Sequence, residues 1–341
     1  MFEGEVATVI RNCPAGTVFL AAVSGGADSM AMLAALCAAV QKDSLHCIHV
    51  EHGLRPPEES SGDAEFVRDF CEKLKINCIV HSVPAGKIAS FAKRKGTGIE
   101  AAARFFRRRA LLREAARLGD NALILTAHTK DDALETSLMR VLRGSGPSGL
   151  AAMPQRRGRF LRPLLSMTRA DVIGYLKEKN IPWREDSTNT DKKFLRNRIR
   201  HQLIPFLNES FPSWKSGLAA MAETQSLAAA FIGDEAQNRI EWVMGDRGCA
   251  GMLSANERVF FSQPEIVREE ALFQGIDKIR SLTGKGKDAF SPKRSVIRRF
   301  CAGLVSAADL GLLRVRRENG KIVISAAKRA CFESGVSLLI K

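Results

Sequence analysis

Two short clusters of polar residues in the first half of the chain have the types and spacing needed to act on a phosphorylated substrate. The first, Ser24-Gly25-Gly26-Ala27-Asp28-Ser29, follows an apolar stretch and precedes a helix-like segment. A glycine turn between a strand and a helix directs backbone amides and the positive end of the helix dipole toward an anion. Asp28 would repel a phosphate unless a cation lay between them, so this cluster predicts a nucleotide phosphate site with Mg²⁺.

The second cluster consists of three acids, Asp131, Asp132 and Glu135, which follow the apolar stretch 122–127. They are spaced three and four residues apart, so on a helix their carboxylates converge. Three acids beside a phosphate loop could bind Mg²⁺ or a cationic substrate. The competing interpretation is that they are ordinary acids favoured by the dipole at a helix N-terminus. Their place after an alternating series of strands and helices favours the functional interpretation.

These clusters need a scaffold, and apolar stretches that alternate with helix-like segments predict one. The pattern is typical of an α/β fold with a parallel, Rossmann-like sheet. Ligands of such sheets bind at the carboxyl ends of the strands, so the phosphate loop, the loop at His52 and the acidic cluster are expected at one edge. The strands are expected at 18–23, 45–50, 76–83 and 122–127, with helices at about 30–40, 58–75 and 98–118.

Positive charge is abundant in this chain and concentrated in one segment. The 52 Lys and Arg residues exceed the 37 Asp and Glu residues, which gives a net charge of +15. Residues 87–117 are strongly basic, and Arg104, Arg107 and Arg108 lie about one turn apart on the helix expected there. This stripe favours contact with the phosphates of a polyanion over the alternative, a solvated arginine face.

Composition restricts the class of protein further. A chain of 341 residues with 45% hydrophobic and 26% charged residues is long enough for two or three globular domains. Its eight cysteines form no C-x-x-C pair, so we expect reduced thiols and neither a disulfide framework nor a metal site. The N-terminus lacks the basic region of a secretory signal, and no apolar stretch is long enough to span a bilayer. We therefore expect a cytoplasmic protein without a membrane partner.

The phosphate loop resembles the PP-loop of the N-type ATP pyrophosphatases, which cut ATP between its α- and β-phosphates. Over roughly residues 15–205 the sequence also resembles the tRNA(Ile)-lysidine synthetase family. The stretches 186–189 and 196–200 are the most specific to that family. Glu51 stands where the family often has Asp, which keeps the charge on a longer side chain. The matching stretches are His52-Gly53-Leu54-Arg55, Glu100-Ala101-Ala102-Ala103-Arg104, Thr126-Ala127-His128, Arg143-Gly144-Ser145-Gly146, Arg162-Pro163-Leu164, Asp186-Ser187-Thr188-Asn189 and Arg196-Asn197-Arg198-Ile199-Arg200.

The resemblance implies an ATP-dependent ligation of free L-lysine to the wobble cytidine of a tRNA(Ile) with a CAU anticodon. An adenylated cytidine forms with release of pyrophosphate, and the lysine ε-amine then displaces AMP. ATP would bind residues 24–29 and His52, and Mg²⁺ would bind Asp28. The implied catalytic residues are Asp28, Arg104, Asp131 and Asp132. The implied lysine-binding residues are Asp131, Asp132 and Glu135, and the tRNA-binding residues are Arg107, Arg108, Arg143, Arg196, Arg198 and Arg200.

Three other functions remain open at this point: a PP-loop tRNA thiolase, a small-molecule ligase of the NAD synthetase type, and a nucleic-acid-binding protein with an inactive nucleotide loop. The absence of C-x-x-C pairs counts against the thiolase.

We expect a PP-loop catalytic domain at 1–212 and a mostly helical, basic tRNA-binding region at 213–341, of one or two subdomains. A helix is expected at 216–244 and a hairpin at 318–321. A homodimer is a further expectation.

Overall fold

The computed structural model describes residues 1–54, 57–185, 195–245, 251–283 and 292–326. Two of the family motifs therefore fall partly or wholly outside it, namely Arg55 and the stretch Asp186–Asn189. The described chain divides into two compact units, Met1–Glu223 and Thr224–Lys341.

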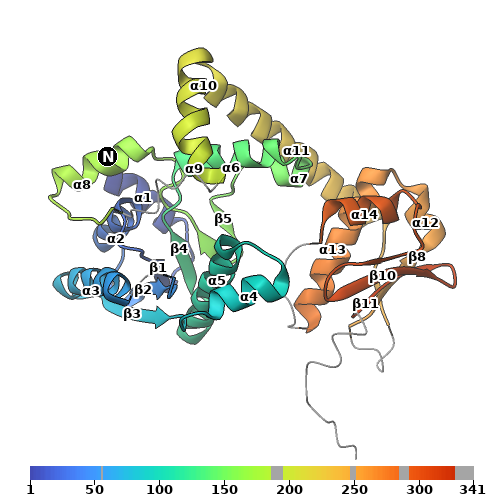
Figure 1. Ribbon diagram of the computed structural model, residues 1–341, viewed down its shortest axis with the longest axis horizontal. Helices are drawn as coiled ribbons and strands as arrows, with labels where there is room; N and C mark the ends of the chain where they lie inside the picture. The colour runs from blue at the N-terminus through green and yellow to red at the C-terminus, as the bar shows by residue number, and fades with distance from the viewer. Residues whose placement is uncertain (55–56, 186–194, 246–250, 284–291, 327–341) are drawn as a thin grey trace, which may run out of the picture. The chain divides into compact units, whose positions relative to one another are not determined.

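The first unit contains the predicted parallel sheet (Figure 1). The strand order is β3-β2-β1-β4-β6-β5, and all neighbours are parallel except β5 and β6. The four expected strands are confirmed, and a short antiparallel pair adds to the edge beyond β4. The strands are β1 (Phe19–Ala22), β2 (Leu45–Glu51), β3 (Asn77–Ser82), β4 (Leu123–Thr126), β5 (Arg156–Arg157) and β6 (Phe160–Leu161).

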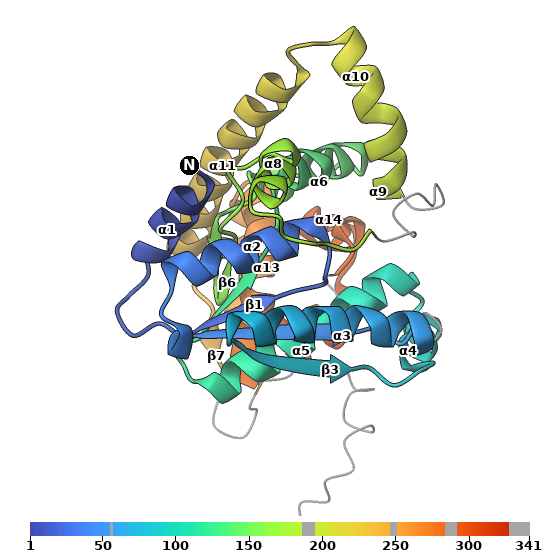
Figure 2. The ribbon, with the colours of Figure 1, turned by 90° about the vertical axis from the view of Figure 1, so that its left-hand side faces the viewer.

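Helices cover both faces of this sheet because apolar residues of its central strands point to both faces. Leu20, Ile48 and Ile124 pack against α5 (Ile99–Leu118), while Phe19 and Ala21 and their neighbours pack against helices on the opposite face. Figure 2 shows α2 and α5 on opposite sides of β1. The helices that contribute to the opposite core are α1 (Phe2–Arg11), α2 (Ala27–Ala39), α3 (Pro57–Leu74) and α8 (Arg169–Glu178).

The first unit contains further helices besides those of the two cores. A capping box starts α8, with Thr168 as N-cap and Asp171 at the third position. The remaining elements are η1 (Lys42–Ser44), α4 (Lys87–Lys95), α6 (Lys130–Leu142), α7 (Pro147–Leu150), α9 (Leu195–Arg198), the π-helical η3 (Ile199–Leu203) and α10 (Ile204–Ser210). Helix α11 (Trp214–Arg239) begins in this unit and continues into the second.

The carboxyl ends of the central strands meet at one edge. Ala22 at the end of β1 is level with Ile48 of β2 and with Thr126 at the end of β4. The His52 loop leaves the same edge through Gly53, whose φ of +58° and close approach to the Val83 carbonyl exclude a side chain. The register thus confirms that the predicted loops leave the sheet together.

The second unit contains a five-stranded antiparallel sheet of order β7-β8-β11-β10-β9, in addition to its helices. The hairpin at Asn319 and Gly320, both with positive φ, is confirmed. The helix expected at 216–244 ends at Arg239, because Trp242 is buried and its indole donates to the Ala271 carbonyl oxygen at 3.0 Å. The elements are β7 (Val243–Met244), β8 (Leu253–Asn256), α12 (Glu257–Ser262), α13 (Glu265–Thr283), α14 (Arg294–Cys301), β9 (Ala307–Asp309), β10 (Leu313–Glu318) and β11 (Lys321–Ala326). None of the helices described in either unit is long and apolar enough to cross a membrane.

Candidate active site

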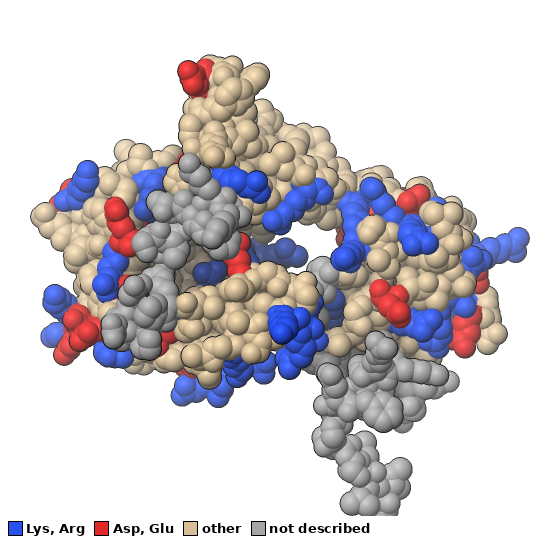
Figure 3. Space-filling model, viewed as in Figure 1, with Lys and Arg blue, Asp and Glu red and all other residues tan. Residues whose placement is uncertain are grey.

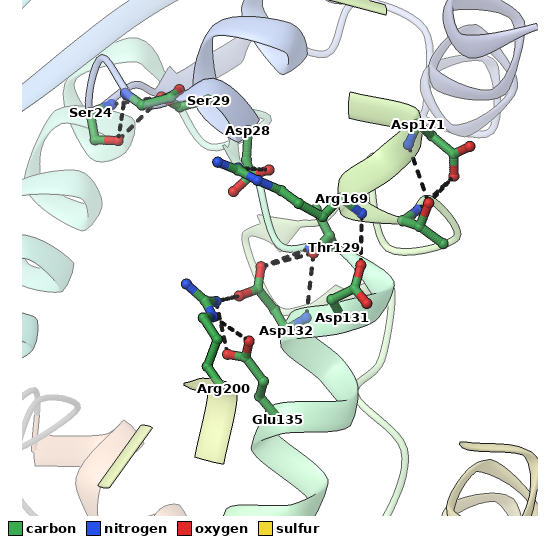
Figure 4. Close-up of polar contacts among 12 residues, drawn as sticks. Ser24, Asp28, Ser29, Thr129, Asp131, Asp132, Glu135, Arg169, Asp171 and Arg200 are labelled. Carbon is green, nitrogen blue, oxygen red and sulfur yellow. Dashed lines mark hydrogen bonds and ion pairs between the residues drawn. The ribbon is translucent and has the colours of Figure 1, made fainter. Parts of the chain in front are cut away.

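The phosphate loop is closed by hydrogen bonds among its own residues (Figure 4). Ser29 Oγ donates to the Gly26 carbonyl oxygen at 2.9 Å and accepts from the Ser24 amide at 3.1 Å. Gly25 has a φ of +89°, which favours glycine. Ser29 is buried and shapes the loop, whereas Ser24 is exposed. The loop leads into α2, whose first-turn amides lack partners within the helix and can therefore bind an anion.

Asp28, in the first turn of α2, forms an ion pair with Arg169 at the start of α8 (Figure 4). Burial raises the pKa of Asp28 above its usual range, and the Arg169 guanidinium opposes this shift. The site therefore disfavours a carboxylate unless a cation accompanies it. A single carboxylate beside a phosphate loop fits Mg²⁺, which commonly takes one or two carboxylates together with phosphate oxygens and water.

The three acids lie in the first two turns of α6 and have different partners (Figure 4). Asp131 Oδ2 accepts from the Arg169 backbone amide at 2.7 Å and so links α6 to the start of α8. Asp132 Oδ2 accepts from the Thr129 amide at 3.0 Å and completes a capping box. Glu135 is buried, with 3% of its side chain exposed. The acids that converge on one position are therefore Asp132 and Glu135.

Two arginines hold this carboxylate pair. Arg196 donates to Asp132 Oδ1 at 2.5 Å and to Glu135 Oε2 at 2.9 Å. Arg200, in the π-helical turn η3, donates to the two Glu135 oxygens at 2.5 and 2.9 Å. Both arginines were predicted to contact tRNA, and the structure directs their guanidinium groups to the acids. This pair of carboxylates therefore already accommodates cationic side chains.

Further arginines gather around α5 and α6 from separate elements. Burial and repulsion by Arg104 lower the pKa of Arg107. Burial and repulsion by Arg157 and Arg104 likewise lower the pKa values of Arg140 and Arg162. Arg107 nevertheless has an exposed side chain that a ligand can reach. Cations that disturb one another in this way favour a polyanionic ligand.

Other predicted residues lie around this centre. Arg104, Arg143 and Arg198 are exposed, and His52 lies partly buried in the loop that follows β2. The Arg108 guanidinium stacks over the Phe160 ring at 4.4 Å, so part of its role is packing. Figure 3 shows basic side chains over α4 and α5 on the face displayed.

Sequence reasoning missed Arg169 as part of the site. It is the first residue of α8, where a cation opposes the helix dipole unless an anion accompanies it. That unfavourable position was a signal that a carboxylate partner had to exist. Its two links, to Asp28 through the side chain and to Asp131 through the backbone, join the phosphate loop to the acidic helix.

His128, between β4 and α6, provides a pH-dependent test of this packing. Burial lowers its pKa to about 4, with Asp132 acting in the opposite direction, and its Nδ1 lies 3.0 Å from Thr126 Oγ1. Between about pH 6.5 and 4 the unfolded chain binds more protons at this residue than the folded chain, so acidification should lower the free energy of unfolding. We expect His128→Gln to reduce this loss of stability between pH 7 and 5, measured by thermal unfolding.

The matched control is His201→Gln, which changes an exposed ring and should keep the original pH dependence. Identical pH dependence in the original protein and in His128→Gln would show that His128 does not carry this linkage.

Comparison with known proteins identifies the class of this chain. Residues 2–207 match the family described as the PP-loop domain, and the chain therefore belongs to that family. The tRNA(Ile)-lysidine synthase of Treponema denticola is 44% identical over 229 residues, which cover 66% of this chain and 49% of the relative. The synthase of Deinococcus radiodurans is 39% identical over 208 residues, which cover 61% and 34%. These matches confirm the resemblance found in the motifs, and the chain spans half or less of the length of these relatives.

A solved structure confirms the fold class. The U34-tRNA thiolase from Methanococcus maripaludis, described with its [4Fe-4S] cluster, aligns with a TM-score of 0.51 at 14% identity, over 67% of this chain and 78% of the thiolase. At that identity the likeness extends to the fold alone. The thiolase alternative is not favoured, because the lysidine synthases match at 39–44% identity.

Proposed function

We propose that this protein ligates free L-lysine to the wobble cytidine of a tRNA(Ile) with a CAU anticodon, by way of an adenylated cytidine. The observation that carries this proposal is the Asp132–Glu135 carboxylate pair, held by two arginines on the helix that follows β4. A protein that binds only anions does not need such a pair. A reaction that joins a nucleotide to a cationic amino acid needs an anion site for the nucleotide and carboxylates for the amino acid. The similarity to lysidine synthases supports the same choice.

In the first step the chain would hold the triphosphate at the loop of residues 24–29 and at His52. The α2 amides and Arg104 would stabilise the charge that develops as the cytidine carbonyl oxygen attacks the α-phosphate. Asp28 would hold Mg²⁺, which supplies charge neutralisation of the phosphates when bound. Arg169 would have to release Asp28 for this, and as a free cation it would remain beside the leaving pyrophosphate.

In the second step Asp132 and Glu135 would bind the ε-ammonium group of lysine. The cations of Arg196 and Arg200 now occupy this pair, so lysine binding would require at least one guanidinium to move. The released arginine could then contact the tRNA, as its predicted role requires. The ε-amine must lose a proton before it attacks, and these carboxylates are the nearest bases to the position proposed for it.

The arginines near α5 would hold tRNA phosphates, and this role can be measured through salt dependence. Each phosphate contact contributes a slope of roughly −0.7 to −0.9 to the plot of log K against log salt. We expect Arg107→Ala to weaken tRNA binding and to flatten the slope by about one contact. Filter binding across a salt series measures both quantities.

Arg117→Ala is the control for this measurement, because Arg117 lies in the last turn of α5 and is paired with Glu114. It should leave the slope unchanged. If Arg107→Ala also left it unchanged, Arg107 would belong to the solvated surface.

The decisive experiment is incubation of the protein with ATP, labelled lysine and mixed bacterial tRNA. Label in RNA that requires ATP, together with AMP and pyrophosphate release, is expected. ATP–pyrophosphate exchange without tRNA would instead indicate a small-molecule ligase, sulfur incorporation a thiolase, and no ATP turnover an inactive nucleotide loop. Persistence of activity after replacement of all eight cysteines would further exclude sulfur transfer.

We also propose that the two regions of the chain have different roles. Residues 1–212 would carry the catalytic domain, and the basic residues 213–341 would bind tRNA. A truncation after residue 212 that still forms adenylate slowly but binds tRNA poorly would support this division. Light scattering of the full chain would test the homodimer.

A further inference from the structure

Three cysteine side chains meet on one face of the sheet in the first unit. Cys47 lies on β2, Cys78 lies directly opposite it on β3, and Cys71 belongs to α3, which packs over both strands. All three sulfur atoms lie within 4.8 Å of one another. Cys47 and Cys71 are fully buried and Cys78 is half-buried. No local sequence pattern indicates this cluster, because its members come from three elements and form no C-x-x-C pair.

The dimensions of the cluster fit one metal ion. Three sulfur ligands at about 2.3 Å from a single ion lie about 4 Å from one another, which agrees with the observed limit. An iron–sulfur cluster needs more widely spaced ligands and room for its inorganic atoms. Soft sulfur ligands select cations such as Zn²⁺ and Cu⁺ and disfavour Mg²⁺.

The surroundings stabilise negative charge on the Cys78 sulfur, whereas hydrogen bonding within the cluster and burial raise the pKa values of Cys47 and Cys71. Hydrogen bonds from the Cys47 and Cys71 thiols lower the pKa of Cys78 well below its usual range, helped by His49 and Arg68. The thiolate form is the one that binds metal. The remaining two protons would be released as the ion binds. Cys78 lies on the edge strand β3 and is partly exposed, so an ion has a route of entry.

We propose that Cys47, Cys71 and Cys78 form a binding site for a single thiophilic cation of the Zn²⁺ type. This site is separate from the proposed ligation chemistry, because none of its three cysteines is among the residues assigned to ATP, lysine or tRNA. Cys47 is level with Ala21, one residue before the end of β1. A bound ion would link α3 to β2 and β3. Since β2 also carries the His52 loop, the ion would stabilise the scaffold of the nucleotide site.

The test is titration of the reduced, metal-free 341-residue protein with Co²⁺, in which the near-ultraviolet sulfur-to-cobalt charge-transfer band is measured. We expect the band to saturate at one equivalent, and Zn²⁺ to abolish it by displacement. Cys78→Ser should lower the affinity roughly tenfold or more. The matched control is the double variant Cys13→Ser, Cys37→Ser, which removes the other two thiols described in this unit and should bind as before.

A second readout keeps the proposal testable if a variant fails to fold. Binding to the native state alone must raise the melting temperature of the unmodified protein, and the increase must grow with the logarithm of the free Zn²⁺ concentration above the dissociation constant. The proposal is overturned by an absent charge-transfer band, by an equal band in Cys78→Ser, or by a loss of the band in the control variant. It is equally overturned if mass spectrometry of the isolated protein finds a disulfide within the cluster in place of metal. None of these outcomes depends on lysine ligation.

Discussion

Asp28→Asn is expected to reduce adenylate formation by roughly a thousandfold, the scale of several kcal/mol in the barrier when a metal ligand and its charge are lost. The fold should survive this change. Burial raises the pKa of Asp28, so the folded state disfavours its charge, and a neutral amide of the same shape should leave the melting temperature equal or higher. Loss of activity without loss of stability is the expected signature of a residue kept for its chemistry. Pyrophosphate release with ATP and tRNA measures the step.

Arg169→Ala separates the metal role of Asp28 from its ion pair. If Asp28 served only to hold Arg169, both variants would lose activity to the same extent. A metal role predicts that Arg169→Ala retains far more activity than Asp28→Asn and needs less Mg²⁺, because the guanidinium no longer competes for the carboxylate. Near-normal pyrophosphate release by folded Asp28→Asn would refute the assignment.

Glu135→Gln is expected to raise the lysine concentration needed for product formation by roughly ten- to hundredfold, while adenylation is largely kept. Loss of one charge-assisted contact costs about 1.5–3 kcal/mol, which gives this range. Adenylation should be largely kept because Asp131 and Asp132 lie nearer the start of α6 than Glu135 does, so they are closer to the metal that the phosphates would bind. Glu135 instead accepts hydrogen bonds from both Arg196 and Arg200. The measurement is the lysine dependence of product formation beside the pyrophosphate burst.

Two comparisons show whether this effect belongs to lysine. Glu135 is nearly buried, so its variant can lose stability through two unpaired guanidinium groups, and thermal unfolding must accompany the kinetics. Glu114→Gln changes an acid paired with Arg117 on α5 and should affect neither step. Equal losses in both steps would place Glu135 in the metal site or in the fold, and no change in either would make it an ordinary helix acid.

The sequence by itself determined the parallel sheet, the phosphate loop and the edge at which the site lies. These features depend on local patterns, namely apolar runs and the glycine turn at Gly25 and Gly26. Since carboxyl ends of parallel strands share an edge, the order of motifs along the chain was enough to place Asp28 and Asp132 in one region. The family motifs confirmed the same assignment independently.

Only the tertiary structure decided which charges meet. Arg196 lies 61 residues from Glu135 in the chain, and no local pattern indicates that it pairs with that acid and not with RNA. The pairing of Asp28 with Arg169 and the meeting of Cys47, Cys71 and Cys78 are equally non-local. Side-chain partners of this kind depend on how separate elements pack, because burial makes an unpaired charge costly and so selects the arrangement in which each carboxylate has a cation beside it.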